Sequence, residues 1–462
     1  MAGEVVAIHV DVGHGVPDEA QASTKIQKLD GSHITPIAQG KIHRFPRGLI
    51  GIGGSNEQRY IVPTFVAIGP YHHGKPHLHK MEEVKLAAMN RFIATANGAS
   101  AGDVSGKLLS VVGDVRGCYA DDEKLKCFSD DDFAAMMLVD GCFLLQFMME
   151  KRKPLFEGRA LSSEYSILKD MMLLENQVPW LVLDTLMEFL PMEMEVEQNV
   201  RCFVADVGDM FLRNNKEHEV SLTTSCFSVL FEVSPHKSSF LKDYKPANLL
   251  DLLRSSQIFR MPTEELSVRL VGSSLLSSSA VELAQIGVNL TASTAEWFGD
   301  MSVKEGPVYG ELSLSQMFLN DVSAGWLVNM AALEASGGAT TADQSSSSSS
   351  VMCSFLSVVA MLMDREEDVH QLRVKQVLYS TLSNAQTLDF FKRISQHLGF
   401  GHRYFYILQQ INKCKQGRPV RSAVHKFLYK HIRAISIILS IASMLVGIFK
   451  ALLVGAIVIK LS

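Results

Sequence analysis

Apolar residues recur at helical spacing along most of the chain. After Lys80, apolar residues such as Met81 and Phe92 share one broad helical face. Ser129 precedes three aspartates, a pattern typical of the first turn of a helix, and the apolar positions that follow, through Met148, occur on every side. This second segment is therefore predicted to be a buried helix. Further helices are predicted at 163–174, 180–190, 246–256, 326–334, 351–364, 386–398 and 404–412.

Strand-like patterns are short and few. Between Ile42 and Gly69, β-rich pieces alternate with turns, and Pro46 and Pro63 restrict these pieces to edge or extended positions. Apolar and polar residues alternate at 265–272 and 310–319, which predicts two further strands, whereas 103–128 is less regular. We predict a mainly α fold: a large helical domain with a few short β-strands near the N-terminus and in the middle, plus one C-terminal transmembrane helix.

Composition shifts divide the chain. With 47% hydrophobic and 20% charged residues, the protein has enough apolar side chains for a folded core. We expect a flexible arm at 1–38, a mostly helical domain at 39–412 that contains a Ser-rich disordered loop at 335–350, a basic juxtamembrane segment at 413–433, and a transmembrane helix at 434–459.

The apolar segment 434–459 is the clearest feature of the C-terminal part. Its 26 residues would rise about 39 Å as a helix, more than the roughly 30 Å of a bilayer's hydrocarbon. Lys450 is its single charge, and we expect the helix to shift or tilt so that this charge avoids the bilayer centre. The alternative is an interior helix of the folded domain.

Charge is distributed unevenly around this segment. No Asp or Glu occurs from Phe390 to Ser462, whereas 12 of the 44 Lys and Arg residues do. Basic residues precede the apolar segment, among them Lys426, Lys430 and Arg433. The positive-inside rule therefore predicts a tail-anchored protein whose body lies in the cytosol, with the plasma membrane as the expected location. The basic residues would also attract anionic lipids.

Four small residues recur every fourth position in the apolar segment. They are Ser443, Gly447, Ala451 and Gly455. Small residues at this spacing let two transmembrane helices approach closely, which would give a homo- or hetero-oligomer, although Gly and Ala are frequent in such helices anyway.

The seven cysteines are widely spaced and form no CxxC pair or other zinc-binding pattern, so we expect reduced and mostly buried thiols. The first residues, MAGEVVAIHV, lack the features of a signal peptide. Both observations favour synthesis and folding in the cytosol.

A histidine-rich turn is the strongest candidate for chemistry. The string Gly69-Pro70-Tyr71-His72-His73-Gly74 is followed by His77 and His79. Four imidazoles in eight residues are a possible zinc or copper set. Neighbouring histidines on a turn rarely face one metal, however, and we favour a turn whose ring nitrogens cap backbone groups before the helix that contains Met81 and Glu82.

Other candidates also favour structural roles. Glu175-Asn176-Gln177, before Pro179, would satisfy backbone groups between two apolar helices rather than supply a general acid. In Asp140-Gly141-Cys142, we expect Gly141 to allow close helix packing and Asp140 to pair with a buried donor. Nothing in the sequence lowers the pKa of Cys142.

Two short motifs resemble known functional sequences. Gly102 to Lys107 imitates a phosphate-binding loop, but the spacing of its glycines is too short and Leu108 replaces the required Ser or Thr. Asn289-Leu290-Thr291 is a glycosylation sequon that is usable only if the body reaches the secretory lumen. We identify no catalytic, cofactor-binding or metal-binding residue, and we expect no cofactor.

Several strings occur together in a recognisable order. They are VAIGPYHHG (66–74), MMLVDGCFLLQ (136–146), LLENQVPWLVL (173–183), PANLLDLLR (246–254), AVELAQIGV (280–288) and LVNMAALE (327–334). With a C-terminal apolar helix, this set resembles the plant family of domain of unknown function 247 over roughly residues 41–459. The resemblance implies a membrane-associated plant protein without established catalytic residues. It also implies a link to pollen-side self-incompatibility in some grass members.

Three functional hypotheses follow. The first is a non-enzymatic, membrane-anchored protein that recognises another protein, in self-incompatibility or other signalling, without a nucleic-acid partner. The second is an enzyme with an unrecognised site around His72, His73 and Glu175. The third is a scaffold at the membrane surface that acts through the basic segment 413–433.

Overall fold

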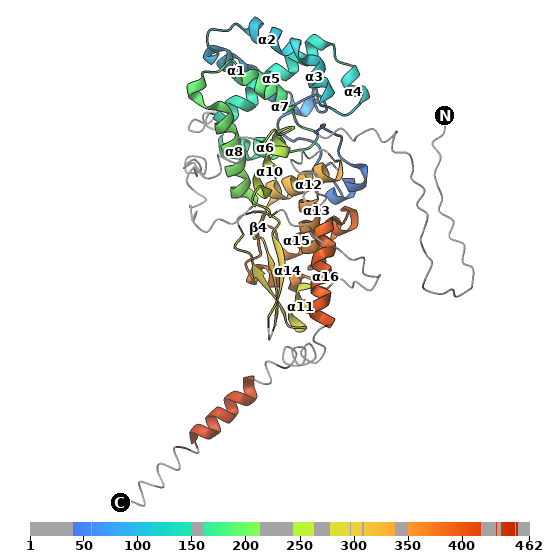
Figure 1. Cartoon of the computed structure of the whole chain (residues 1–462), viewed down its shortest axis with the longest axis vertical. Coiled ribbons are helices and arrows are strands. Elements are labelled where there is room, and N and C mark those ends of the chain that lie inside the picture. Colours follow the sequence, from blue (N-terminus) through green and yellow to red (C-terminus); the bar gives the residue numbers. More distant parts are fainter. Residues whose placement is uncertain are drawn as a thin grey trace, which may run out of the picture. The chain divides into compact units, whose positions relative to one another are not determined.

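The computed structural model describes residues 40–416 except 57, 150–159, 213–243, 263–277, 296, 307–308 and 338–349; it also describes 431, 436–448 and 450 (Figure 1). Several predicted features lie outside the described residues: the arm 1–38, the strand candidate 265–272, most of the loop 335–350, Cys226, Lys426, Lys430, Arg433, Ala451 and Gly455.

Helix α5 (Asp130–Met149) is central to the N-terminal part of the fold. The hydroxyl of Ser129 accepts a hydrogen bond from the backbone N–H of Asp132 at 3.1 Å, which caps the first turn as the sequence predicts. Phe133, Phe143 and Leu144 are fully buried. Other helices pack around α5: α1 (Lys80–Thr95), α2 (Ala101–Ser110), α7 (Trp180–Met187) and α8 (Val196–Leu212). A helix that is apolar on every side is therefore stable here as the core of the fold.

Further helices build the rest of the body. They are α6 (Ala160–Met171), α10 (Leu249–Ile258), α11 (Ala280–Gln285), α12 (Asp321–Ala335), α13 (Val351–Met361), α14 (Glu366–Val374), α15 (Asn384–His397) and α16 (His402–Gln416). In Figure 1, α12, α13, α15 and α16, which come from the second half of the sequence, are coloured orange to red. Trp326 of α12 is fully buried and donates a hydrogen bond from its indole nitrogen to the carbonyl of Leu168, which joins α12 to α6.

The described strands are short and lie beside these later helices. They are β1 (Val288–Ala292), β2 (Met301–Glu305), β3 (Gly310–Leu314), β4 (Met317–Leu319) and β5 (Leu378–Ser380). β3 is the middle strand, parallel to β1 and antiparallel to β2, and β4 pairs in parallel with β5. The single strand predicted at 310–319 is β-structure, but it is divided into β3 and β4, which belong to different sheets.

The strands predicted near the N-terminus, between Ile42 and Gly69, do not form among the described residues, whereas the extended alternative is confirmed for part of this segment. The described residues there form the 3-10 helix η2 (Arg47–Gly53) and extended chain, with one isolated parallel bridge between Ile42 and Tyr119. The physical reason is that side chains of distant helices, rather than a neighbouring strand, accept the backbone hydrogen bonds of this segment.

The region 103–128, where the sequence pattern is less regular, is more helical than that pattern indicates. This region contains most of α2, then α3 (Val112–Gly117) and α4 (Glu123–Lys126). Ser100 and Asp103 form a reciprocal capping box that starts α2, a signal present in the sequence. The string that imitates a phosphate loop, 102–107, lies inside this helix. Two more 3-10 helices are η3 (Pro76–Leu78) and η4 (Met192–Met194).

Two apolar segments differ in their surroundings. Within the described residues, α5 is the one helix both long and apolar enough to cross a membrane, and it is mostly buried in the fold. The described part of the predicted transmembrane segment is the helix Ser436–Ile448, which is too short to meet this criterion by itself. All its residues are exposed, including Ser443 and Gly447, and Leu439 is 64% exposed.

The described cysteines form no disulfide. Cys142, Cys202, Cys353 and Cys414 are buried, whereas Cys118 is partly buried and Cys127 is exposed. Free and mostly buried thiols therefore agree with the sequence-based expectation for the six cysteines that the structure describes.

Candidate functional site

The segment from Pro63 to Gly69, which leads into the turn at 70–74 that the sequence predicts, is held by polar side chains that are distant in sequence. Asp170, at the end of α6, accepts hydrogen bonds from the backbone N–H groups of Thr64, Phe65 and Val66 at 2.6 to 3.1 Å. Burial raises the pKa of Asp170 to about 6, although these backbone donors act in the opposite direction. One carboxylate thus replaces the strand partner that this segment lacks.

Asn176 continues the support of the same segment. Its side-chain oxygen accepts a hydrogen bond from the N–H of Ile68 at 2.8 Å, and its amide donates to the carbonyls of Val66 and Asp170. Every polar atom of this fully buried side chain therefore has a backbone partner.

Asp140 and Lys85 form a buried ion pair below the next residues. The Lys85 ammonium lies 2.6 Å from Oδ1 of Asp140 and also donates to the carbonyl of Ala67, while Oδ2 of Asp140 accepts from the N–H of Gly69. Glu82 adds a second carboxylate 2.8 Å from Lys85. Burial by itself would lower the pKa of Lys85, but the charge of Asp140 raises it above its usual range. The ammonium therefore stays charged.

Gln177 closes the turn between α6 and α7. Its amide donates to the carbonyls of Met171 and Leu173, its side-chain oxygen accepts from the N–H of Leu250, and its own carbonyl accepts from the hydroxyl of Tyr119. A side chain on Gly69, whose φ is +73°, would lie 2.3 Å from this carbonyl. Glycine is thus required there by both conformation and space.

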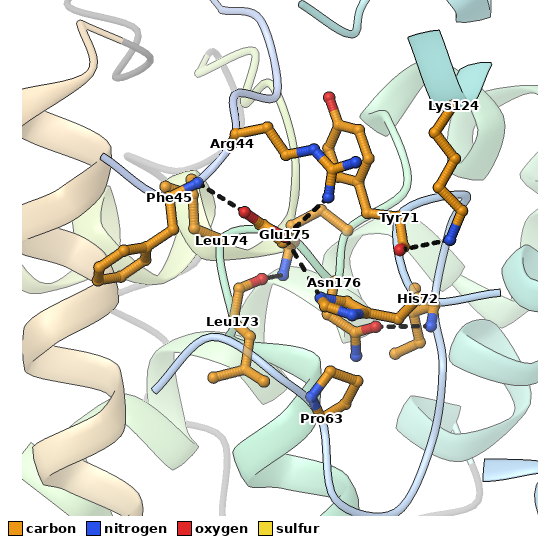
Figure 2. A network of polar contacts seen from close by, with 12 residues as sticks. Arg44, Phe45, Pro63, Tyr71, His72, Lys124, Leu173, Leu174, Glu175 and Asn176 are labelled. Atoms are coloured by element: carbon orange, nitrogen blue, oxygen red, sulfur yellow. Dashed lines mark hydrogen bonds and ion pairs between the residues drawn. The ribbon is translucent and has the colours of Figure 1, made fainter. Parts of the chain in front are cut away.

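Glu175 faces a more exposed part of the same region (Figure 2). One carboxylate oxygen accepts a hydrogen bond from the N–H of Phe45 at 2.9 Å, and the other lies 3.0 Å from the Arg44 guanidinium. Arg44 also pairs with Asp122 at 2.7 Å and lies over the ring of Tyr71, 4.0 Å from its centroid. This arrangement fastens the segment before η2 to both α4 and the turn between α6 and α7.

His72 lies beside Glu175 in Figure 2 and is buried, with 2% of its surface exposed. Its Nε2 lies 3.6 Å from Glu175, and neither ring nitrogen makes a well-formed hydrogen bond to a described residue, although the Ile61 backbone lies close enough to act on the pKa of the ring in the upward direction. Burial, followed by the charges of Lys75, Lys124 and Arg44, lowers the pKa of His72 to about 3. The ring is therefore neutral at physiological pH.

The histidines do not share one role. His77 lies 3.1 Å from the carbonyl of Pro63, His73 packs edge-to-face against Phe128, and His79 stands at the N-cap of α1 without a side-chain capping bond. The prediction that these rings cap backbone groups is therefore confirmed for His77 and wrong for His79. Within the described residues, no group of three or more His, Cys, Asp or Glu side chains is arranged to hold a metal ion.

The remaining motif residues serve packing. A side chain on Gly141 would lie 2.5 Å from Leu186, so this glycine allows α5 to approach α7. Cys142 is fully buried, and burial raises the pKa of its thiol far above the usual range. Pro179 is the N-cap of α7, one position before the predicted place, and Met81 is buried on α1.

Several residues of the region were missed by sequence analysis: Arg44, Lys85, Tyr119 and Asp170. Lys85 carried one signal, because it shares the apolar face of α1 four residues after Met81. Lys85 is the buried donor that the sequence led us to expect for Asp140. The structure also brings Asn176, Gln177 and Glu175 to the same region.

Comparisons with known proteins agree with the order of these motifs. The model of DUF247, described as a plant protein of unknown function, matches residues 42–446. The UPF0481 protein At3g47200 of Arabidopsis thaliana is 25% identical over 391 residues, which cover 78% of this chain and 73% of that protein. The putative UPF0481 protein At3g02645 of the same plant is 36% identical over 131 residues, 28% of this chain and 24% of that protein. No solved structure is significantly similar to this chain.

Proposed function

We propose that this chain, which belongs to the plant DUF247 family, is a non-enzymatic protein that a C-terminal apolar helix holds to a membrane and whose folded body recognises another protein. The observation that carries the proposal is the helix Ser436–Ile448, whose described side chains are all exposed although most are large and apolar. Apolar surface of this extent requires a partner, and a bilayer is the partner that covers a helix on every side.

Length and sequence context support the anchor. The described helix would rise about 20 Å, and the apolar sequence continues to Ile459, for about 39 Å in total. Helix α5 provides the contrast, because its apolar surface is covered by α1, α2, α7 and α8. The helix Ser436–Ile448 has no such cover among the described residues.

The distribution of charge supports one orientation. Lys426, Lys430 and Arg433 precede the apolar segment, and Lys460 is the single basic residue after it. We therefore place the body in the cytosol and the last residues across the membrane. A role in pollen–pistil self-incompatibility is a narrower form of this proposal, in which the partner is a pistil-derived protein or another family member.

The non-enzymatic part of the proposal is supported by how the polar side chains are used. Asp140, Asp170, Asn176 and Gln177 are engaged by backbone groups or by a buried ion pair. The buried thiol of Cys142 has a raised pKa, which opposes a role as nucleophile.

Extraction of membranes at alkaline pH tests the anchor. We expect the full chain to remain with membranes from plant cells, and we expect the double substitution Ile441→Glu and Leu445→Glu to move it to the supernatant. Val374→Glu is the matched control, because Val374 is an equally exposed apolar residue of the body, at 58%. Release of the unaltered chain would contradict the proposal.

Protease protection and the glycan at Asn289 test the orientation. Asn289 lies in β1, an edge strand of its sheet, and is partly exposed. A body digested from the cytosolic side, with Asn289 unmodified, is the expected result. A protected and glycosylated body would reverse the orientation and place recognition outside the cell.

The enzyme hypothesis retains one favourable observation, the unpartnered ring nitrogens of His72 beside Glu175. Tight zinc binding by the full chain that is lost in His72→Ala with His73→Ala would favour this alternative. The scaffold alternative requires salt-sensitive binding of the basic segment 413–433 to anionic liposomes.

A further inference from the structure

Two basic side chains contact Tyr71, and a third basic residue follows it in the next turn. We call Arg44, Lys75 and Lys124 the basic cluster. The Arg44 guanidinium lies over the Tyr71 ring, and the Lys124 ammonium donates a hydrogen bond to the Tyr71 carbonyl at 2.7 Å (Figure 2). Lys75 lies on the turn that follows, where its N–H donates to the carbonyl of His72.

The nearby carboxylates are both paired with Arg44. Its guanidinium contacts both oxygens of Asp122, at 2.7 and 3.3 Å, and one oxygen of Glu175, at 3.0 Å. Among the residues that the structure describes, no carboxylate lies within ion-pair distance of Lys75 or Lys124. Three positive charges thus face two negative charges, which leaves an excess of one.

This excess is unfavourable in the structure as it stands. Partial burial lowers the pKa of both Lys75 and Lys124. Arg44 acts in the same direction on each, and although Glu175 opposes it, the net shift of each pKa is downward. Lys75 also lowers the pKa of Lys124. His72, with its unpartnered ring, lies within the field of all three cations. Crowded like charges at a partly exposed position are typical of a binding site for an anion.

We infer that the basic cluster is the recognition surface of the body and that it binds a single carboxylate from an acidic segment of a partner protein. The excess of one positive charge matches one carboxylate, whereas a phosphate dianion would leave an excess of negative charge. Arg44 is already occupied, so Lys75 and Lys124 supply the free donors. This inference rests on the proposed function, because it names the chemistry of the protein partner.

Fluorescence anisotropy with the full chain in non-ionic detergent tests the inference. The probe is a labelled peptide of eight glutamates, and the reference is the same peptide with eight glutamines. We expect at least tenfold tighter binding of the glutamate peptide at low salt, with clear weakening at high salt. We further expect Lys75→Gln with Lys124→Gln to reduce this affinity about tenfold, and Lys→Arg at both positions to retain it.

Lys126→Gln is the matched control. Lys126 lies on α4 two residues after Lys124, but its charge is already paired with Glu123 at 2.8 Å and Asp121 at 3.5 Å. Its substitution removes the same charge and is expected to change the affinity less than twofold. The single variant Lys75→Gln controls for misfolding. The Lys75 ammonium makes no hydrogen bond or ion pair within the described structure, so this substitution removes no such interaction from the fold.

Three results would overturn the inference: equal binding of the two peptides, equal loss in Lys126→Gln, and tighter binding of a matched phosphoserine peptide than of the glutamate peptide. The last result would identify a phosphate as the ligand. Because the assay is done in detergent, failure of the membrane anchor does not affect it. Conversely, loss of peptide binding does not affect the extraction test.

Discussion

The ammonium of Lys85 lies 2.6 Å from the carboxylate of Asp140, and each side chain is 1% exposed. The pair joins α1 to α5, and its remaining hydrogen bonds hold the backbone at Ala67 and Gly69. A buried ion pair of this kind costs desolvation of both charges, so the loss of one partner is more damaging than the loss of both.

Removal of one member of this pair is therefore expected to destabilise the fold strongly. Asp140→Ala leaves the Lys85 charge and the Gly69 N–H with fewer partners, and we expect a loss of about 3–5 kcal/mol. Chemical denaturation of the full chain in detergent measures this loss. The double variant Asp140→Leu with Lys85→Met should lose less, and a loss equal to the sum of the two single variants would contradict the argument.

Substitution of Gly69 tests the close approach of two segments. Gly69→Ala places a methyl group 2.3 Å from the carbonyl of Gln177 at a φ of +73°, and we expect a loss of about 3 kcal/mol. Gly74→Ala is the matched control, because Gly74 has a φ of +78° and open space around it. Conformational strain alone should cost that variant about 1 kcal/mol. Equal losses would show that the contact with Gln177 is unimportant.

The neutral His72 ring predicts sensitivity to acid. Its pKa is about 3 in the folded chain and 6.5 ordinarily, so the unfolded chain binds more protons between these values. The contribution of His72 to stability is therefore complete above about pH 6.5 and is lost as pH falls toward 3. We expect about 2 kcal/mol lower stability at pH 5 than at pH 7 from this residue.

His72→Phe isolates this effect. Because the ring nitrogens have no hydrogen-bond partner among the described residues, phenylalanine should change stability at pH 7 by less than about 1.5 kcal/mol. Between pH 7 and pH 5, the free energy of unfolding should fall by about 2 kcal/mol less in the variant than in the unaltered chain. An unchanged pH dependence would rule out His72 as its source.

Glu175 and Arg44 should affect the segment around Phe45 unequally. Glu175→Ala removes the acceptor of the buried Phe45 N–H and should cost about 1–3 kcal/mol. Arg44→Met removes a guanidinium that is 40% exposed and should cost no more than about 1 kcal/mol. Amide hydrogen exchange of Phe45 reads out the difference, because only the first variant removes its hydrogen-bond acceptor. Equal acceleration in both variants would contradict this assignment.

Local signals explain which elements were predictable. Ser129 with its three aspartates, and the apolar positions that follow, specify α5 through capping and burial, both of which act within a few residues. Ser100 and Asp103 carried an equally local signal for α2 that was overlooked. The segment near Ile42 was misread because β-rich composition does not indicate where a strand would find its partner.

The candidate site could be predicted only in part from the sequence, because local patterns do not indicate distant partners. Asp140, Asn176 and Gln177 were recognised as buried polar residues with structural roles, but each also has a backbone partner that lies 71, 108 or 73 residues away, respectively. Asp170 carried no local signal, because its role depends on three N–H groups more than 100 residues earlier. Arg44 likewise gains its importance from Asp122 and Glu175.

The sequence by itself determined the helical class, the family and the apolar C-terminal segment, since each depends on periodicity, motif order or composition within short stretches. Only the tertiary structure decided that the motifs converge on the segment from Pro63 to Gly74 and that Lys85 forms an ion pair with Asp140. The same is true of Lys75 and Lys124, which lack carboxylate partners among the described residues. These relationships depend on how helices pack, and packing brings together residues whose separation along the chain carries no pattern.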